Sequence, residues 1–211
     1  MIFTKNEAWE YVGRLSEPSK MPCYSYSIPA RACKTGGKLA KIAGTVCSKC
    51  YAFRGNYPRP NVQKSMKRRI ASISQPYWVA AMVKAISSRE SSGYFRFFDS
   101  GDLQSLGHLI KVCEIARQLP KIKFWLPTRE VGILKAYLHA GFSFPNNLTV
   151  RFSASRFEVS PPKGLLLALG IVSSKVSKVK WNCPAYAQEG KCLSCRACWN
   201  KGRKLIVYKY H

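Results

Sequence analysis

Most of the nine cysteines in this sequence fall into two groups whose spacing is typical of metal binding. The C-terminal group consists of Cys183, Cys192, Cys195 and Cys198, and its last three members follow one another at two-residue gaps. This is the local spacing of ferredoxin-type cluster loops, in which Cys183 would supply a fourth thiolate. Four thiolates also suit tetrahedral zinc, but zinc sites usually contain two well-separated pairs. The overlapping pairs therefore favour a [4Fe–4S] cluster, with zinc as the alternative.

A second group of cysteines lies in a lysine-rich loop nearer the N-terminus. Cys47 and Cys50 form a Cys-x-x-Cys pair, and thirteen residues separate Cys33 from Cys47. The pair lacks the β-α-β context of a thioredoxin redox site, so we expect the three thiols to hold a metal, such as a cluster with one open iron. Cys23 is either a further ligand that closes this site or a small buried residue. The two groups form two metal sites or share ligands around one.

Three other potential ligands are expected to have structural roles. Cys113 has the spacing of a core residue within a predicted helix, which favours packing over metal binding. His108 and His139 lie near predicted helix ends, far in sequence from the cysteines. We therefore expect each histidine to be structural or exposed.

Two aspartates are the most conspicuous acidic residues of the chain. Asp99 and Asp102 are its only aspartates, and both follow a predicted strand within four residues. They either support the turn and cap the next helix, or belong to a site that holds a divalent cation or a bound cofactor. Arg129 and Glu130 follow the next strand and should reach the same edge. We assign these four residues as candidate catalytic residues and leave open whether the protein is an enzyme.

The charge of the chain predicts a polyanionic partner. The formal net charge is +25, and no acidic residue occurs between Glu17 and Glu90. Such a charge destabilises a fold by self-repulsion unless a polyanion neutralises it, so we expect binding to DNA or RNA with little sequence preference. A solvated basic surface without a specific partner is the alternative. The expected contacts are the basic residues of the first cysteine loop, of the following helix and of the tail: Lys38, Lys41, Arg54, Arg59, Lys64, Lys67, Arg68, Arg69, Lys201, Arg203 and Lys204. Interleaved with them, Tyr51, Phe53 and Tyr57 either stack on unpaired bases or pack around the metal loop.

Alternating strands and helices must position these residues. Strands are predicted at 94–98, 122–126 and 148–152, and helices at 62–73, from 75 onward, at 106–119 and at 131–140. This alternation implies parallel β-α-β units with right-handed crossovers, whose sites lie at the carboxyl ends of the strands. Because 211 residues are few for an eight-stranded barrel with appended segments, we predict an α/β fold. It is a partial β/α barrel or a small parallel sheet, with irregular cysteine-rich segments at both ends.

We expect a single domain over residues 1–211, made of a basic metal-binding loop region (1–60), a β/α core (61–180) and a cysteine-rich C-terminal segment (181–211). Metal binding should contribute to the folding of the two irregular segments. The sequence has no apolar run long enough for a membrane span and no signal-peptide pattern. We therefore expect a cytoplasmic protein without a membrane partner. The sequence gives no indication of an oligomeric state.

Several motifs together resemble the phage gene product 88 family. They are Lys20-Met21-Pro22-Cys23, Ser27-Ile28-Pro29-Ala30, Cys33, Cys47-x-x-Cys50-Tyr51-Ala52, Asp99-Ser100-Gly101-Asp102 and the cysteine-rich C-terminus. The resemblance implies a phage origin, and hence the cytoplasm of a host cell, and it supports the metal interpretation. More distantly, the chain is similar to radical S-adenosylmethionine enzymes, which hold a cluster with three cysteines near the start of a partial β/α barrel. In those enzymes the cysteines are compactly spaced, whereas here Cys33 is remote from the pair.

Taken together, these features predict an iron–sulfur phage protein with one or two [4Fe–4S] clusters that binds nucleic acid through a basic surface. One alternative is a radical-S-adenosylmethionine-like or metal-dependent enzyme that acts on nucleic acid at the carboxyl ends of the strands. The other is a zinc-binding, nucleic-acid-binding protein.

Overall fold

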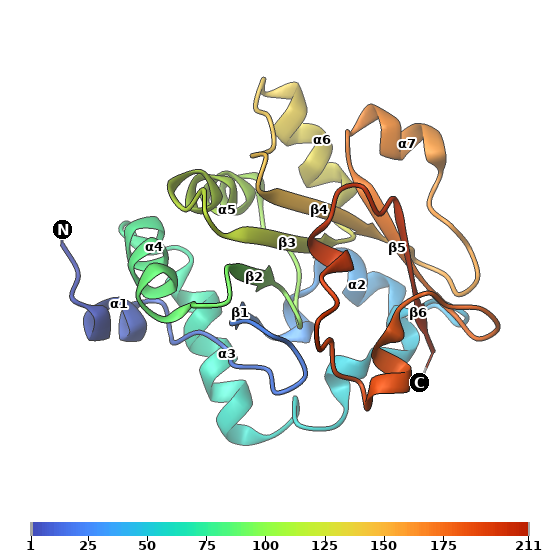
Figure 1. Cartoon of the computed structure of the whole chain (residues 1–211), viewed down its shortest axis with the longest axis horizontal. Helices are drawn as coiled ribbons and strands as arrows, with labels where there is room; N and C mark the ends of the chain where they lie inside the picture. The colour runs from blue at the N-terminus through green and yellow to red at the C-terminus, as the bar shows by residue number, and fades with distance from the viewer. Residues whose placement is uncertain (1, 211) are drawn as a thin grey trace.

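The computed structural model describes residues 2–210, which build one six-stranded parallel sheet. The strands are β1 (Ser25–Tyr26), β2 (Tyr94–Phe97), β3 (Lys123–Thr128), β4 (Leu148–Ser153), β5 (Val172–Ser177) and β6 (Leu205–Lys209). They lie side by side in chain order, as in a β/α barrel, but among the described residues β1 and β6 do not pair and the sheet stays open (Figure 1). This confirms the predicted α/β fold of parallel β-α-β units, and the open sheet is compatible with both predicted arrangements, a partial barrel and a small parallel sheet.

Helices cover one face of the sheet and part of its carboxyl edge. The α-helices are α1 (Lys5–Tyr11), α2 (Lys34–Leu39), α3 (Pro60–Ser72), α4 (Trp78–Arg89), α5 (Leu106–Gln118), α6 (Val131–His139) and α7 (Lys163–Ala168). Figure 1 shows α4, α5, α6 and α7 along one side of the sheet, with the C-terminal segment crossing the other side. Among residues 2–210, no helix combines the length and the apolar character needed to cross a bilayer.

Helix α5 illustrates how local sequence sets an element. Ser105 caps its start by accepting a hydrogen bond from the backbone N–H of His108, at 3.1 Å. Leu109, Val112 and Cys113 recur at helical spacing and are fully buried against the sheet. Pro120 prevents continuation of the helix beyond Leu119. The predicted helix is therefore present, and it ends within one residue of the expected position.

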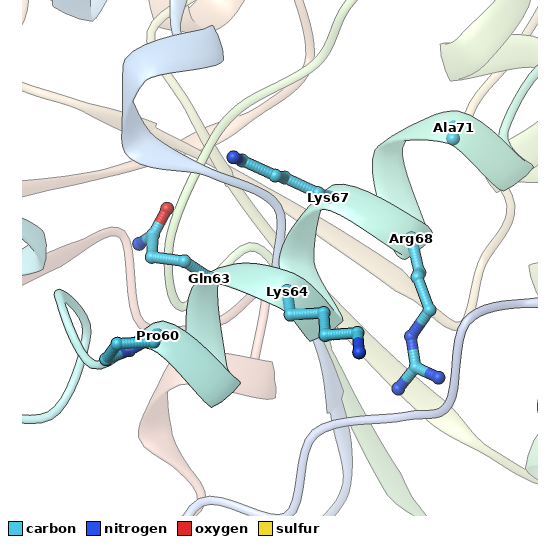
Figure 2. A pocket seen from close by; sticks show the side chains of 6 residues that line it. All are labelled: Pro60, Gln63, Lys64, Lys67, Arg68 and Ala71. Atoms are coloured by element: carbon cyan, nitrogen blue, oxygen red, sulfur yellow. The ribbon is translucent and has the colours of Figure 1, made fainter.

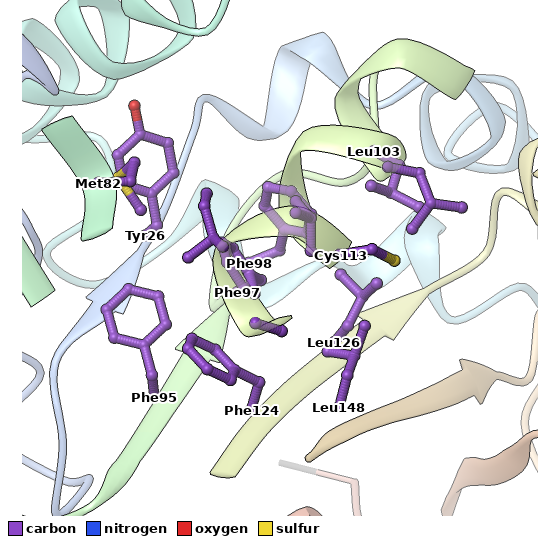
Figure 3. Close-up of a cluster of buried hydrophobic side chains, with 14 of the residues drawn as sticks. Tyr26, Met82, Phe95, Phe97, Phe98, Leu103, Cys113, Phe124, Leu126 and Leu148 are labelled. Carbon is purple, nitrogen blue, oxygen red and sulfur yellow. The ribbon is translucent and has the colours of Figure 1, made fainter. Parts of the chain in front are cut away.

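The core lies between the helices and one face of the sheet. Alternate strand residues, such as Phe95, Phe97 and Phe124, point toward α4 and α5, and the rings of Phe97 and Phe124 stack with 5.8 Å between centroids (Figure 3). Cys113 lies inside this cluster and is fully buried, as its spacing predicted. His108 is also buried, at 2% exposure, whereas His139 is exposed.

The opposite face of the sheet is covered by the C-terminal segment between β5 and β6. Trp199 anchors this segment, because its indole N–H donates to the carbonyl oxygen of Phe95 at 2.8 Å. The Thr149 hydroxyl donates to the Trp199 carbonyl oxygen, also at 2.8 Å. The side chain of Arg151, fully buried in β4, donates to the carbonyl oxygens of Ser173 and of Arg203. The predicted irregular character of this segment holds between the two strands, where only 3-10 turns occur in the described chain.

Two strands have their outer edges occupied by the chain itself. At β1, Ser16 forms an antiparallel bridge with Ser25 through two backbone hydrogen bonds of 2.8 Å. At β6, the side chain of Asn182 accepts from the N–H of Val207 at 2.8 Å and donates to the carbonyl oxygen of Leu205 at 3.2 Å. Backbone groups that would otherwise be free at both edges are thus satisfied.

Candidate functional site

The acidic turn after β2, residues 99–102, lies at the carboxyl edge of the sheet. Asp99 is 8% exposed, and its carboxylate accepts hydrogen bonds from the hydroxyls of Ser25, at 2.8 Å, of Ser27, and of Tyr57, at 3.1 Å. Its carbonyl oxygen accepts a further bond from the Tyr51 hydroxyl. Three hydroxyl donors to the carboxylate and one to the backbone carbonyl therefore fix Asp99 in place, and the buried carboxylate has hydrogen-bond partners.

The backbone of the acidic turn is held in a conformation that few residues adopt. Phe98 has φ +56° and Gly101 has φ +86°, both in the left-handed region. A Cβ on Gly101 would lie 2.2 Å from Cγ1 of Ile28 and 2.9 Å from its carbonyl oxygen. The N–H of Ile28 donates to the Ser100 carbonyl oxygen at 3.0 Å. The turn is therefore pressed against the segment that follows β1, and only glycine fits at 101.

Asp102 links the acidic turn to the end of β3. Its carboxylate accepts from the Thr128 hydroxyl at 2.6 Å, from the N–H of Arg129 at 2.8 Å and from the N–H of Leu103 at 2.8 Å. Burial raises the pKa of Asp102 to about 6, although these hydrogen bonds oppose the shift. The interpretation of Asp102 as a helix cap is wrong, because Ser105 caps α5.

Hydrogen bonds join the cysteine loop to the segments that follow β3 and β4. The Glu130 carboxylate accepts from the backbone N–H and from the hydroxyl of Thr35 in α2, each at 2.8 Å. The N–H of Val46 donates to the carbonyl oxygen of Ser155, after β4, at 2.9 Å. The ends of β2, β3 and β4 and the cysteine loop therefore converge on one edge, as the parallel arrangement predicted.

The N-terminal cysteine trio, Cys33, Cys47 and Cys50, lies at this edge. Cys33 directly precedes α2, and Cys47 begins a 3-10 turn that Cys50 closes by donating its N–H to the Cys47 carbonyl oxygen at 3.2 Å. Gly36 packs closely beside two of the thiols. A Cβ there would lie 3.0 Å from the Cβ of Cys33, 3.6 Å from the sulfur of Cys47 and 3.7 Å from that of Cys33.

The electrostatic setting of the trio connects it to the strand ends. Burial raises the pKa of Cys33 to about 12, and the Asp102 carboxylate and the other two thiols of the trio add to the shift. Arg129 acts in the opposite direction on the pKa of Cys33 and of Cys47. The Arg129 Nε atom is buried and has no hydrogen-bond partner among the described residues. The trio therefore shares its surroundings with one carboxylate and one guanidinium that is not fully satisfied.

The C-terminal cysteine group, Cys183, Cys192, Cys195 and Cys198, lies on the sheet face opposite the helices. Burial raises the pKa of Cys192, and the Cys183 and Cys195 thiols contribute to the shift. Burial also raises the pKa of Cys198, to about 11, and its sulfur lies 3.3 Å from the hydroxyl of Tyr208 in β6. These thiols are therefore neighbours in space as well as in sequence.

Among the described residues, neither the trio nor the C-terminal cysteine group forms a preformed site for a single metal ion. Among residues 2–210, no three His, Cys, Asp or Glu side chains converge closely enough to hold one metal ion. Tetrahedral zinc requires four ligands about 2.3 Å from one point. A cluster holds its thiolates farther apart, because an iron atom lies between each thiolate and the centre.

Arg96 is a site residue that the sequence analysis missed. It lies in β2 with its guanidinium 4.2 Å from the ring centroid of Trp125, and it donates to the Tyr51 hydroxyl at 3.5 Å and contacts the Met21 sulfur at 3.2 Å. The Asp99 carboxylate and the Cys192 thiol are both among the groups that interact with it. Arg96 therefore lies between the acidic turn and the C-terminal cysteine group. The available signal was an arginine between aromatic residues in a strand with two buried faces.

The basic residues assigned to nucleic acid divide into three sets. Seven are exposed on the cysteine loop and α3: Lys38, Lys41, Arg54, Arg59, Lys64, Lys67 and Arg68. Figure 2 shows a shallow hollow on α3, lined by Pro60, Gln63, Lys64, Lys67, Arg68 and Ala71. Arg69 is buried at 6% exposure, and its guanidinium donates to the carbonyl oxygens of Arg14 and Ser27, so it does not belong to the exposed surface.

The three basic residues of the tail do not extend this surface. Lys201 and Lys204 line a separate, largely apolar hollow beside α7, together with Leu166 and Ile171. In Figure 1, α7 and α3 lie at opposite ends of the molecule. The aromatic residues also divide: Phe53 is 45% exposed, whereas Tyr57 is engaged with Asp99.

The fold and the site define a class of protein: an open parallel β-α-β sheet wound in chain order, with a three-cysteine loop at its carboxyl edge. The chain belongs to the gene product 88 family, whose sequence model matches residues 3–163. This match covers the trio, the acidic turn and β1 to β4, and it ends before the C-terminal cysteine group. Comparison with curated proteins found no match. Comparison with solved structures found none either.

Proposed function

We propose that this protein is an iron–sulfur protein that binds nucleic acid and has its reactive centre at the carboxyl edge of the sheet. The position of the trio carries the proposal, because all three thiols lie in one loop beside Asp102 and Arg129. This is the edge at which parallel α/β proteins place their sites. Three thiolates leave one iron of a [4Fe–4S] cluster without a protein ligand. That position supplies a binding point for a small molecule with oxygen or nitrogen donors.

The surrounding residues have roles that follow from their contacts. Asp102 is held by three donors and fixes the start of the segment after β3. Arg129 offers its unpartnered Nε–H to an anionic or carbonyl group at the same edge. Glu130, through Thr35, holds α2 and with it the Cys33 end of the loop. The C-terminal cysteine group forms the second metal site of the proposal.

Metal analysis tests the cluster directly. Protein purified without oxygen should be brown and contain iron and acid-labile sulfide in comparable amounts. Replacement of the trio by alanine should remove one portion of the iron, and replacement of the C-terminal group should remove the other. Stoichiometric zinc in colourless protein would reject the iron–sulfur proposal in favour of a zinc site.

Two adjacent glycines of α2 give a matched pair of variants. Gly36→Ala places a methyl group 3.0 Å from the Cβ of Cys33 and against the sulfur atoms of Cys33 and Cys47, whereas Gly37→Ala meets nothing within 4 Å among the described residues. Both substitutions favour the helix equally. Gly36→Ala should therefore lower the iron content of the trio, and Gly37→Ala should leave it unchanged. Equal iron content in both variants would argue against a cluster in this space.

Nucleic-acid binding is supported by the position of the uncompensated charge. The acid-free stretch between Glu17 and Glu90 contains the trio, and its exposed lysines and arginines surround the cysteine loop. Phe53 adds an exposed ring with the Arg31 guanidinium 5.8 Å from its centroid. A basic surface with exposed aromatic residues suits an unpaired strand, whose bases stack on such rings.

One observation favours an enzyme as the second candidate. The cysteine loop follows β1, the acidic turn follows β2, and the strands are wound in chain order. The more distant resemblance to radical S-adenosylmethionine proteins implies the same order. The test is incubation of the protein with adenosylmethionine and a strong reductant, using Asp99→Ala as the variant and Lys135→Ala as the control. Cofactor cleavage that is lost only in Asp99→Ala would support the enzyme, and no cleavage in the wild type would reject it.

A further inference from the structure

Cys23 lies on the side of the C-terminal cysteine group and not on that of the trio. It precedes β1, whereas the trio follows the carboxyl end of that strand. Its side chain is 7% exposed and packs in one cluster with Trp125 and Trp199, against which Cys198 also packs. The alternative in which Cys23 closes the N-terminal site would require it to reach past the whole of β1.

The backbone beside Cys23 is joined to the C-terminal segment. The N–H of Cys192 donates to the carbonyl oxygen of Lys20 at 2.9 Å. The Lys20 side chain lies so close to Gly190 that a Cβ there would be 2.9 Å from its Nζ atom. The segment at 20–23 is therefore part of the wall around the C-terminal thiols.

The environment of Cys23 differs from that of a thiol with a packing role. Cys113 shows what packing looks like in this molecule, since it is fully buried in the core between α5 and the sheet. Cys23 has two indole rings and the Cys198 thiol as neighbours. Burial raises the pKa of Cys23 to about 12, with Glu90 and Cys192 adding to the shift and Arg96 opposing it.

We propose that Cys23 is a ligand of the C-terminal metal group, with three of Cys183, Cys192, Cys195 and Cys198 as the others. The inference rests on the proposed cluster and assigns one of its ligands. As a thiolate, with its proton released to solvent, Cys23 would supply one of the four sulfur ligands of the cluster. Such a ligand set would join the start of β1 to the segment before β6, the two ends of the open sheet.

The test uses a background in which Cys33→Ala, Cys47→Ala and Cys50→Ala remove the trio, so that the remaining iron belongs to the C-terminal group. In this background, Cys23→Ala should lose at least about fivefold in iron and sulfide, whereas the control Cys113→Ala should retain both. Retention of iron in Cys23→Ala would overturn the inference. A background protein without any iron would instead reject the C-terminal half of the proposed function, so the two failures are distinguishable.

A conservative variant covers the case in which the alanine variant fails to fold. Cys23→Ser keeps the size of the side chain and offers an oxygen ligand. If Cys23 binds iron, the reduced cluster of Cys23→Ser should show an altered electron paramagnetic resonance spectrum, while Cys113→Ser should match the background. An unchanged spectrum with full iron content in Cys23→Ser would assign Cys23 to packing alone.

Discussion

The two aspartate carboxylates of this protein are held by hydroxyl and backbone N–H donors and not by oppositely charged side chains. Asp99 is the clearest case, because two serines and a tyrosine donate to its carboxylate. Asp102 follows the same rule with Thr128 and two backbone N–H groups. The three ion pairs among the described residues all lie on the surface, where such pairs contribute little to stability. Excess positive charge therefore stays available to an external anion.

The buried histidine predicts a specific pH dependence of stability. Burial lowers the pKa of His108 to about 3, below the ordinary value of about 6.5. Between these values the unfolded chain binds a proton that the folded chain does not, so stability falls as the pH is lowered below about 6.5. At pH 5 the contribution of His108 to the loss should be about 2 kcal/mol relative to pH 8. Asp102 partly offsets it in the wild type, because its raised pKa of about 6 makes the folded chain bind a proton that the unfolded chain does not.

The measurement compares chemical unfolding of the wild type and His108→Gln at both pH values. Glutamine keeps an acceptor for the Gln104 N–H, which His108 Nδ1 accepts at 3.3 Å, but it does not titrate. The variant should lack this part of the pH dependence. His139→Gln, on the exposed end of α6, should behave like the wild type. Parallel pH curves for the wild type and His108→Gln would contradict the prediction.

Gly101→Ala should be among the most destabilising single-methyl additions in the chain. The new Cβ meets Ile28 at 2.2 Å, and the φ of +86° is unfavourable for alanine, so the free energy of unfolding should fall by about 3 kcal/mol or more. Gly141→Ala is the control. It has a similar φ of +79° with nothing within 4 Å, and should cost about 1 kcal/mol. Equal losses in the free energy of unfolding of the two variants would mean that the acidic turn can shift to accommodate a methyl group at position 101.

The irregular segment between β5 and β6 is held to the sheet mainly by side-chain hydrogen bonds and not by regular backbone hydrogen bonding. Between β5 and β6 the chain contains only short 3-10 turns among the described residues, and two residues, Trp199 and Arg151, supply many of its bonds to the sheet. Metal binding contributes folding free energy where such segments lack a core of their own. The same reasoning applies to the loop that carries the trio.

Removal of the metal should therefore loosen these segments before the centre of the sheet. In metal-free protein, hydrogen exchange should accelerate first at residues 33–50 and 183–199, while β3, α5 and β4 keep their protection. The measurement is exchange followed by mass spectrometry on the holo and the metal-free protein. Exchange that rises uniformly would show that the metals stabilise the whole fold, and unchanged exchange would remove their structural role.

The sequence predicted the elements whose stabilisation is local. Helix α5 carries its own cap and a helical pattern of buried residues, and β3 and β4 are rich in β-formers, so all three lie close to their expected bounds. Strand β1 has two residues, and β5 contains three serines and a lysine among its six residues, which gave no strand pattern. These strands exist because neighbouring strands and the C-terminal segment pair with them.

The distinction between local and long-range stabilisation also applies to the candidate site. The convergence of the strand ends followed from parallel topology and was predictable. The location of Cys23 and the burial of Arg69 depend on contacts with residues more than 40 positions away in sequence, and no local pattern encodes them. Arg96 was missed because a lone arginine in a strand is ambiguous until its aromatic partner is known.

At the scale of the whole molecule, the charge is concentrated where the site lies. Helix α3, which carries three of the exposed basic residues, lies in the lower part of Figure 1, away from α6 and α7 at the top. A polyanion bound there would pass close to the carboxyl edge of the sheet. Binding and the proposed centre are therefore properties of the same side of the molecule.

Reversal of three charges on α3 should show whether nucleic-acid binding depends on where the positive charges lie or only on the net charge of the protein. Lys64→Glu, Lys67→Glu and Arg68→Glu together should weaken binding of single-stranded nucleic acid about 10- to 1,000-fold at low salt and reduce the log–log salt slope by up to about 3. The control carries the same change of net charge on exposed residues elsewhere: Lys84→Glu, Lys121→Glu and Lys135→Glu. Equal losses in both triple variants would show that only net charge matters.

The covered edges of the sheet limit how this molecule meets its partners. Ser16 at β1 and Asn182 at β6 already occupy the backbone groups that an incoming strand would need. The protein is thus protected from edge-to-edge polymerisation, the usual hazard of an unclosed sheet. Recognition of another chain by strand addition would first require one of these segments to detach. The proposed polyanionic partner would therefore have to be recognised through side chains and not through strand addition.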